Sequence, residues 1–319
     1  MSKSFRLSLI ALGLLAFTAS RAAASDANSA ALFLELGAGA RAAALGGAVS
    51  ANVKDATSAY WNPAGLAHLN GWDLAGTHTE WLEDIRYEHV SVARNRGRHA
   101  LGVSFATVYA GDFDARDEVG NKDLSFGFSD VALAGSYAMA VSPDLSVGGT
   151  AKYYRSSIDD NVADGIAFDF GAQYQTGVDG LAFGAAVRNL GGQVQYNVEG
   201  ARSWDLPRTL QVGASWRRSL ESLSGSLLLT GDVIAEKNQD ASIRVGTEYR
   251  YKEQFGLLFG YRADLSDKNS DVPESQQIDD TQNLSFGASF ERNLRFEYAY
   301  VPFHSDLGST HRFSIGKHW

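Results

Sequence analysis

Hydrophobic and polar positions alternate along most of the chain after residue 72. Between residues 101 and 105, for example, Leu101, Val103 and Phe105 alternate with Gly102 and Ser104. Strict alternation over about ten residues is typical of a β-strand with one apolar face and one polar or small face. The pattern therefore predicts a protein built mainly of strands, whose large apolar side chains share one surface of the sheet.

Fourteen segments of the chain carry this alternation. They lie near residues 72–80, 86–95, 98–109, 130–141, 144–155, 165–175, 180–189, 208–217, 225–234, 242–251, 254–263, 283–291, 293–301 and 310–319. Single-chain outer-membrane barrels contain an even number of antiparallel strands. The predicted fold class is therefore all-β, a transmembrane outer-membrane β-barrel of about 14 antiparallel strands.

The connections between the predicted strands fall into two classes. Short turns are expected at residues 96–97, 142–143, 176–179, 252–253 and 292. Long polar stretches lie on the opposite side of the predicted barrel, at residues 110–129, 190–207 and 264–282. Short periplasmic turns and long external loops are typical of outer-membrane barrels. A soluble, secreted β-sandwich has no reason to sort its loops in this way, so the loop lengths favour the membrane barrel.

Aromatic residues lie at the ends of the apolar faces, where a membrane barrel has its interfacial girdles. They are Tyr109, Tyr153, Tyr174, Trp216, Tyr261 and Tyr300. The sequence stops at Trp319, after the alternating positions Phe313, Ile315 and Lys317. A terminal aromatic residue on a final strand resembles the signal read by the barrel-assembly machinery, so Trp319 is the predicted assembly signal.

The first residues predict export. Lys3 and Arg6 precede an apolar run over residues 7–19, and three alanines at residues 22–24 form a small-residue cleavage site. Residues 1–24 are therefore predicted to be a secretory signal peptide, whose apolar part is too short to span a bilayer. We expect a protein exported to the outer membrane of a Gram-negative cell, in contact with its lipid and lipopolysaccharide.

Composition excludes several classes of protein. The formal net charge is −9, and three cations, Lys3, Arg6 and Arg21, leave with the predicted signal peptide. An acidic chain lacks the clustered cations that nucleic-acid binding requires, so no nucleic-acid partner is expected. The sequence contains no Cys, which excludes disulfides, thiolate metal sites and a lipoprotein anchor.

Residues 25–71 do not alternate and are rich in alanine and glycine. They end in "AYWNPAGL", where Asn62 is placed to cap a short helix and Pro63 takes its first position. A barrel of about fourteen strands encloses a lumen too wide for wall side chains to fill. We therefore predict that residues 25–71 form a plug inside a barrel of residues 72–319. The motif of this plug is Trp61, Asn62, Pro63, Ala64 and Gly65.

The strings "GARAAALGGAVSA" and "DATSAYWNPAGL", at residues 39–51 and 55–66, resemble the N-terminal signature of the PorV/PorQ family of outer-membrane proteins. The barrel of that family looks like that of the FadL fatty-acid transporters, in which a segment ending in Asn-Pro-Ala folds into the barrel as a plug. The resemblance is close over residues 33–70 and rests on pattern and loop order elsewhere.

Two functions follow from this resemblance. The first is a role in protein secretion of the type IX kind, in which PorV-like barrels dock and shuttle exported proteins. The alternative is FadL-type passive transport of hydrophobic small molecules, such as fatty acids and hydrocarbons. A purely structural role in the envelope is a third. The expected partners are accordingly secreted proteins or a hydrophobic small molecule, besides the assembly machinery.

Charged residues at inward-facing strand positions form a second candidate site. They are Lys152, Asp169, Arg188, Arg217, Arg244, Glu248, Arg250, Arg262, Glu291, Arg295 and Glu297. Charges inside a membrane barrel are expected to pair with one another or to contact a substrate. We favour the pairing interpretation, in which these charges hold plug and wall together, and their number argues against a purely apolar path.

Three further patterns predict no metal or cofactor site. Residues 37–42 match part of a dinucleotide fingerprint, but antiparallel strands follow them in place of a βαβ unit. Residues 267–278 begin like a calcium loop but lack its required Gly and Glu. His304, His311 and His318 recur every seven residues, a spacing that does not share one face of a strand. No local arrangement isolates a nucleophile and a base, so no enzyme activity is predicted.

Overall fold

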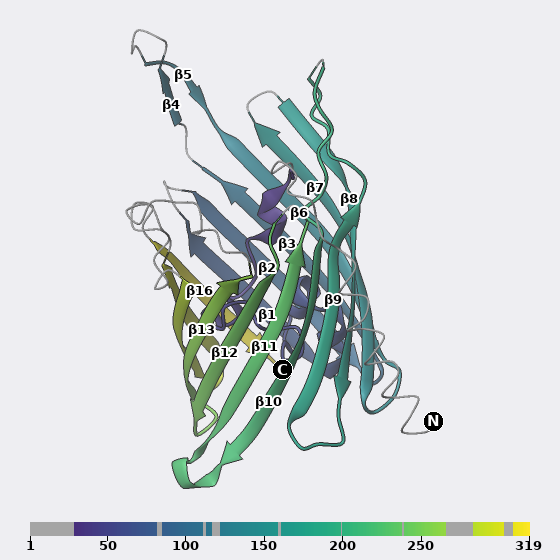
Figure 1. The fold of residues 1–319 in the computed structure, drawn as a ribbon, viewed down its shortest axis with the longest axis vertical. Coiled ribbons are helices and arrows are strands. Elements are labelled where there is room, and N and C mark those ends of the chain that lie inside the picture. Colours follow the sequence, from purple (N-terminus) through teal and green to yellow (C-terminus); the bar gives the residue numbers. More distant parts are fainter. Residues whose placement is uncertain are drawn as a thin grey trace.

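The alternating segments join edge to edge into a closed barrel (Figure 1). The computed structural model describes residues 29–81, 85–110, 113–116, 122–158, 161–198, 200–237, 239–265, 283–302 and 309–319. Among them, fourteen strands form one antiparallel barrel in the order β1-β16-β15-β14-β13-β12-β11-β10-β9-β8-β7-β6-β3-β2. The predicted fold class of a closed, fourteen-stranded antiparallel barrel is confirmed. The barrel strands are β1 (Trp72–Glu80), β2 (Arg86–Arg96), β3 (His99–Tyr109), β6 (Phe128–Ala140), β7 (Leu145–Ile158), β8 (Asn161–Gln175), β9 (Leu181–Gly191), β10 (Thr209–Leu220), β11 (Gly225–Glu236), β12 (Ser242–Tyr251), β13 (Phe255–Asp264), β14 (Leu284–Glu291), β15 (Arg295–Pro302) and β16 (Ser309–His318).

The barrel closes between its first and last strands. The pairing of β1 with β16 runs from Asp73 opposite His318 to Glu80 opposite His311. Beyond it, Trp72 and Trp319 exchange two backbone hydrogen bonds of 2.8 and 3.0 Å, and their stacked rings lie 6.3 Å apart. Closure leaves no free strand edge, which is what a sheet surrounded by hydrocarbon requires.

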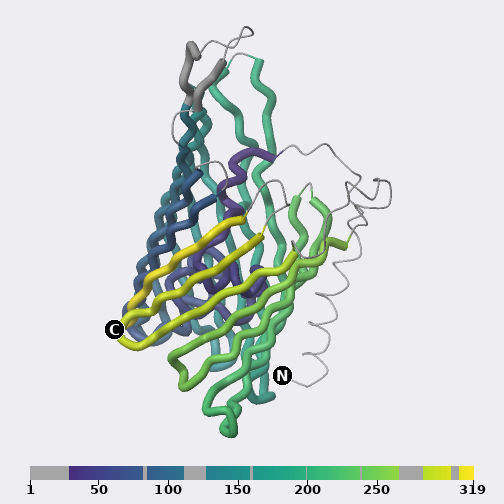
Figure 2. Tube along the Cα trace, turned by 90° about the vertical axis from the view of Figure 1, so that its left-hand side faces the viewer, coloured from purple at the N-terminus to yellow at the C-terminus, as the bar shows by residue number. Residues whose placement is uncertain are grey.

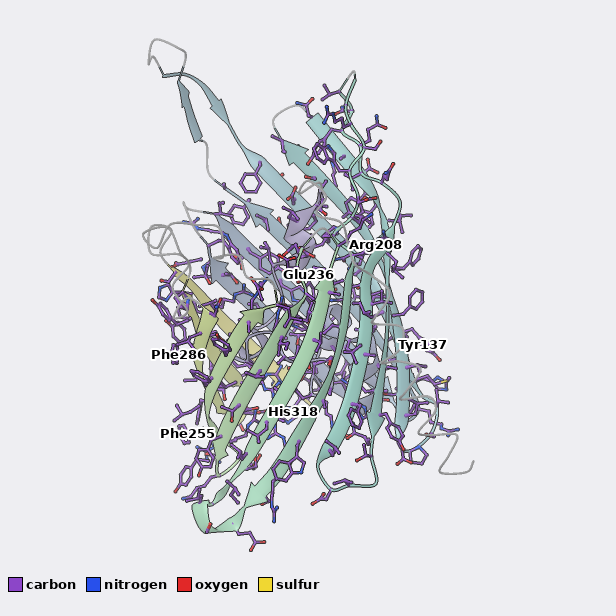
Figure 3. The ribbon with its side chains drawn as sticks, viewed as in Figure 1. Tyr137, Arg208, Glu236, Phe255, Phe286 and His318 are labelled. Carbon is purple, nitrogen blue, oxygen red and sulfur yellow. The ribbon has the colours of Figure 1, made fainter. Side chains whose placement is uncertain are left out.

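The two faces of the wall differ as the alternation predicts. Large apolar side chains point outward, and Leu101 and Leu133 keep 66% and 55% of their surface exposed. Figure 3 shows Phe255 and Phe286 at the outer surface of the wall, where both are exposed. Inward positions on the same strands carry small residues, such as the buried Ala134. An apolar outer surface suits lipid, and a small-residue inner surface allows another backbone to approach.

The predicted loop at residues 110–129 contains further strands, so its prediction as a loop was wrong. Within it, β4 (Phe113–Arg116) pairs with β5 (Lys122–Phe126) in a separate two-stranded sheet that projects beyond the barrel (Figure 1). Strands of four and five residues lie at the lower limit of the length over which alternation indicates a strand. In the predicted loop 190–207, Val194 and Trp204 form an isolated bridge. Most of the third loop, residues 266–282, lies outside the described residues.

Residues 29–71 lie inside the barrel (Figure 2). They enter at the end that carries the long connections, where Ser29 pairs with Asp205, and lead into β1 at the opposite end. Their short helices are η2 (Leu32–Glu35), α2 (Ala40–Ala44), α3 (Ser58–Trp61) and η3 (Pro63–His68), and a further turn, η4 (Glu221–Leu223), joins β10 to β11. Among the described residues, no helix has the length and apolar composition needed to cross a membrane.

The N-terminal segment, residues 29–71, packs against opposite sides of the inner wall. Its helix α2 contacts β13 to β16, and η3 contacts β2, β3, β6, β7 and β8. Ala40, Leu45 and Leu66 are fully buried by these contacts. A side chain at Gly184 of β9 would collide with the backbone of Ser50. The small inward residues of the wall therefore make room for this segment.

Candidate functional site

The motif residue Asn62 caps a helix, as predicted, and also contacts the wall. Asn62 precedes η3, with Pro63 at the first helical position, and its Oδ1 accepts a hydrogen bond of 3.2 Å from the Ala64 N–H. Its Nδ2 donates to the carbonyls of Ala172 and Ala185, at 3.1 and 3.3 Å. These two residues belong to β8 and β9, so the fully buried Asn62 ties the N-terminal segment to the barrel. The capping pattern alone does not predict this second role.

The other motif residues fill the space around Asn62. Trp61 is buried, and its ring lies 5.0 Å from the guanidinium of Arg188 on β9. The backbone of Pro63 lies so close to Gly148 on β7 that a Cβ there would be 2.5 Å from the Pro63 carbonyl carbon. Gly65 backs directly onto the backbone of an earlier turn of the segment. Gly148 and Gly65 are therefore positions where no Cβ fits, which explains glycine at both.

One buried carboxylate joins the segment to the later strands. Glu248 on β12 is fully buried and lies 2.7 Å from Arg41 of α2, 2.8 Å from Arg250 and 3.3 Å from Arg217 on β10. Arg250 also reaches Glu291, at 3.0 Å. Three guanidinium groups thus share one carboxylate, and its loss would leave Arg41 and Arg217 without their ion-pair partner and Arg250 with Glu291 alone.

A second cluster has the opposite ratio of charges. Arg295 on β15 contacts Asp55 of the segment at 3.7 Å, Asp73 at 3.4 Å and Glu297 at 3.4 Å. Burial raises the pKa of the Asp55 carboxyl, but the charge of Arg295 and hydrogen bonds from Thr57 outweigh burial, so this pKa lies below its usual value. Both clusters join the segment to the wall, which is the arrangement expected from the pairing interpretation of the lumen charges.

These clusters border a cavity of about 380 Å³ that we call the inner chamber. It lies between the N-terminal segment and the barrel end that carries the short turns. Five of the predicted lumen charges line it, namely Arg217, Arg250, Glu291, Arg295 and Glu297. Arg41, Asp55 and Lys54 line it from the segment. The inner chamber is therefore an ionic space.

A second cavity, of about 510 Å³, lies on the long-connection side of the segment, and we call it the outer chamber. Its apolar lining includes Leu32, Leu36, Trp61, Trp81, Val301 and Pro302. The predicted lumen charges Arg244 and Arg262 also line it, and each has a carboxylate partner. Arg244 lies 3.1 Å from Glu236, which is labelled in Figure 3, and Arg262 lies 3.1 Å from Asp264.

Glu35, at the end of η2, brings a carboxyl group to the outer chamber. Burial raises the pKa of Glu35 to about 7, and the neighbouring charge of Glu236 adds to this effect. Thr209 Oγ1 donates a hydrogen bond to the carboxyl at 3.3 Å, and Gln239 Nε2 donates at 3.4 Å. This carboxyl therefore changes its charge near neutral pH.

Arg312 on β16 is a buried cation at the outer chamber. Its Nη1 donates to the Leu36 carbonyl at 2.7 Å, and its guanidinium lies 5.5 Å from the Trp81 ring. Its Nε has no hydrogen-bond partner, and Arg312 forms no ion pair with any carboxylate that the structure describes. The alternation along β16 places Arg312 inward next to the outward Phe313, and this is the sequence signal that predicts its position.

The remaining predicted residues lie apart from both chambers. Lys152 pairs with Asp169 at 2.8 Å, and both are buried on the early strands. Trp319 lies at the seam opposite Trp72, so its role as assembly signal stays a prediction. Among the described residues, no group of three His, Asp or Glu side chains is placed to hold a metal ion. The predicted signal peptide, residues 1–24, and the calcium-like stretch, residues 267–278, lie outside those residues.

Sequence comparison places the chain in a family. A model of the uncharacterised protein family UPF0164 matches residues 14–264, which reach from the N-terminal region to the end of β13. A search among curated proteins gives no match. The resemblance to PorV/PorQ proteins therefore stays a prediction.

Structure comparison finds the same fold in known outer-membrane barrels. The toluene transporter TbuX of Ralstonia pickettii is 15% identical, with a TM-score of 0.59 over 89% of this chain and 98% of that one. The toluene transporter TodX of P. putida is 12% identical, with a TM-score of 0.60 over 89% and 99%. A FadL homologue of Pseudomonas aeruginosa is 12% identical, with a TM-score of 0.50 over 87% and 97%. The chain belongs to the uncharacterised protein family UPF0164 and has a barrel fold similar to that of FadL-type outer-membrane proteins.

Proposed function

We propose that the protein is a FadL-type passive channel of the outer membrane for small molecules with an apolar body. The observation that carries this proposal is the outer chamber, whose volume of about 510 Å³ suits a small organic ligand. Leu36, Trp61, Trp81 and Val301 offer apolar surface there. Burying a ligand against such surface contributes roughly 25 cal/mol per Å².

Polar groups of the outer chamber suit one end of such a ligand. Arg312 is buried without a carboxylate partner among the described residues, so an anionic end would supply its missing counter-charge. The pKa of Glu35 lies near 7, so at lower pH this carboxyl is protonated and can hydrogen-bond to a neutral polar end of a ligand. The proposed substrate class is therefore an apolar molecule with a small polar or anionic end.

In this proposal residues 25–71 are the plug of the barrel. The pairs Arg41 with Glu248 and Asp55 with Arg295 hold the plug to the wall below the outer chamber. Passage requires that these contacts shift or open. Export by the signal peptide, residence in the outer membrane and assembly through Trp319 belong to the same proposal.

The similar structures support this proposal through their architecture. TbuX and TodX are toluene transporters with 15% and 12% identity to this chain. The proposal takes the barrel from this likeness and takes the ligand chemistry from the outer chamber itself. The proposal therefore depends on the residues that line the outer chamber.

Uptake by whole cells tests the proposal. Ala43 lines the outer chamber from α2, and Ala43→Trp would fill that space without altering a charge. We expect uptake of octanoate and toluene, in a host without its own channel, to fall at least tenfold. Leu223→Trp, at an exposed position of η4, is the control and should leave uptake unchanged. Equal uptake by the native and Ala43→Trp proteins, both with the heat-modifiable migration of a folded barrel, would contradict the proposal.

A second proposed function is docking or shuttling of exported proteins in a type IX-like secretion system. Two observations favour it, namely the PorV/PorQ-like string at residues 39–66 and the β4–β5 sheet that projects beyond the barrel (Figure 1). Replacing residues 111–127 by a short Gly-Ser turn should reduce the export of secreted proteins and leave octanoate uptake intact. The opposite pattern, with export intact and uptake lost, favours the channel.

A further inference from the structure

One corner of the inner chamber collects positive charge and hydrogen-bond donors. Lys54 of the N-terminal segment, Arg217 of β10 and Gln175 at the end of β8 all line it. Lys54 is exposed to this space and forms no ion pair or hydrogen bond with any residue that the structure describes. It is therefore a free cation inside the mouth of the barrel.

The neighbours of Lys54 add to its charge instead of neutralising it. Although Lys54 faces the open space of the chamber, the surrounding protein partly removes it from bulk water, which lowers its pKa, and the charge of Arg217 lowers this pKa further. Burial also lowers the pKa of His68 to about 4, and Lys54 contributes to that effect. Arg217 has a carboxylate partner in Glu248, but that carboxylate already receives two other guanidinium groups. Like charges held together without a counter-charge are destabilising.

The carboxylates across the chamber are already engaged. Asp55 and Glu297 both contact Arg295, at 3.7 and 3.4 Å. Glu291 contacts Arg250 at 3.0 Å. None of the described carboxylates that line the chamber is therefore left to act as the counter-charge of Lys54.

Gln175 supplies an independent observation. Its position on β8 faces inward, and its Nε2 is buried without a hydrogen-bond acceptor. A buried donor left without a partner costs about 1–3 kcal/mol. Such a group calls for an explanation, which a bound acceptor provides.

We propose that this corner of the inner chamber binds an oxyanion, a phosphate or carboxylate group, with Lys54, Arg217 and Gln175 as its donors. The anion supplies the missing counter-charge and the missing acceptor at once. Free phosphate and the carboxylate end of a molecule leaving the barrel share this chemistry. The site stands apart from the role proposed for the outer chamber, because it rests on a different cavity and different residues.

Ligand-dependent stability tests the site on the full chain in detergent. The temperature at which the folded band is lost on a gel is measured in chloride, in inorganic phosphate and in butyrate. Since an anion that binds only the folded state stabilises it, we expect phosphate or butyrate to raise this temperature. Lys54→Gln should weaken the apparent affinity about tenfold, as expected for one lost charged hydrogen bond. Lys252→Gln removes an exposed cation from a turn outside the chamber and should respond as the native protein does.

Gln175→Glu gives a readout that a purely structural role would not. The new carboxylate is a built-in counter-charge, so the variant should be more stable than the native protein in chloride and should lose its response to the anion. A structural glutamine predicts a less stable variant instead. A response to phosphate alone identifies free phosphate as the ligand, and a response to butyrate identifies a carboxylate end. No shift of the native protein with either anion, or an undiminished shift in Lys54→Gln, would overturn the proposal.

Discussion

The outer and inner chambers share one barrel and one dividing segment, but their charges differ in what they contact. In the outer chamber Arg312 lies among aromatic and aliphatic side chains, without a carboxylate partner among the described residues. At the inner chamber Glu248 and Arg295 each contact three oppositely charged groups. Charge in the lumen thus has two uses. The pairs that join the segment to the wall position the segment, and an unpaired cation, Arg312 in the outer chamber or Lys54 in the inner one, is available to a ligand.

The physics of buried ion pairs explains this division. A buried pair adds little net stability compared with apolar packing, but breaking it is costly because one charge stays buried alone. The pairs at the inner chamber therefore fix where the segment sits more than they strengthen the fold. A lone buried cation such as Arg312 has a desolvation cost, which a bound anion offsets. Arg312 therefore favours the binding of an anionic ligand and does little to fix the position of the segment.

Glu248→Gln should have the largest effect on this comparison. It leaves Arg41, Arg217 and Arg250 around a neutral amide. Breaking a buried ion pair in this way lowers the free energy of unfolding by about 3–5 kcal/mol. We expect the folded band to disappear at a lower temperature and the conductance in planar bilayers to rise as the segment loosens.

Glu236→Gln is the matched change at the outer chamber. It unpairs only Arg244 and removes the neighbouring charge that raises the pKa of Glu35, so its loss of stability should be smaller. Equal losses in the two variants would show that the inner pairs do not position the segment.

The sequence predicts the barrel far better than it predicts either chamber. Strands such as β3 and β6 repeat one period over ten or more residues, and that signal survives local exceptions. The inward parity of Glu248 and Arg295 follows from the same alternation. Their partners do not, because Arg41 and Asp55 lie in an irregular segment whose register against the wall depends on long-range packing. No local pattern encodes contacts across some two hundred residues.

Asn62→Ala should have an intermediate effect. Asn62 both caps η3 and bonds to β8 and β9, so its loss removes a cap worth ~1 kcal/mol and also the hydrogen bonds to the Ala172 and Ala185 carbonyls. We expect the free energy of unfolding to fall by about 1–3 kcal/mol in total. The conductance should rise, because the segment that divides the chambers is less firmly held. Asn197→Ala is the control, because Asn197 makes a comparable bond to Val162 at an exposed site. Unchanged conductance in Asn62→Ala would mean that other contacts hold the segment.

Glu35→Gln should have the smallest effect, and it separates the chambers by pH. The pKa of Glu35 is raised from an ordinary 4.5 to about 7, so the folded state holds this proton more tightly than the unfolded chain does. Stability therefore falls as the pH rises from about 4.5 to about 7, by about 1 kcal/mol once partial exposure is allowed for. Asp55 at the inner chamber has a lowered pKa, so its contribution is lost only at more acidic pH. Between about pH 4.5 and about pH 7, the stability of the Glu35→Gln protein should no longer fall with rising pH. The Glu221→Gln change lies in the exposed η4 turn and should leave the fall as it is in the native protein. Stability is measured as the temperature at which the folded band disappears. If it changes with pH equally in the native, Glu35→Gln and Glu221→Gln proteins, Glu35 does not give the outer chamber its response to pH.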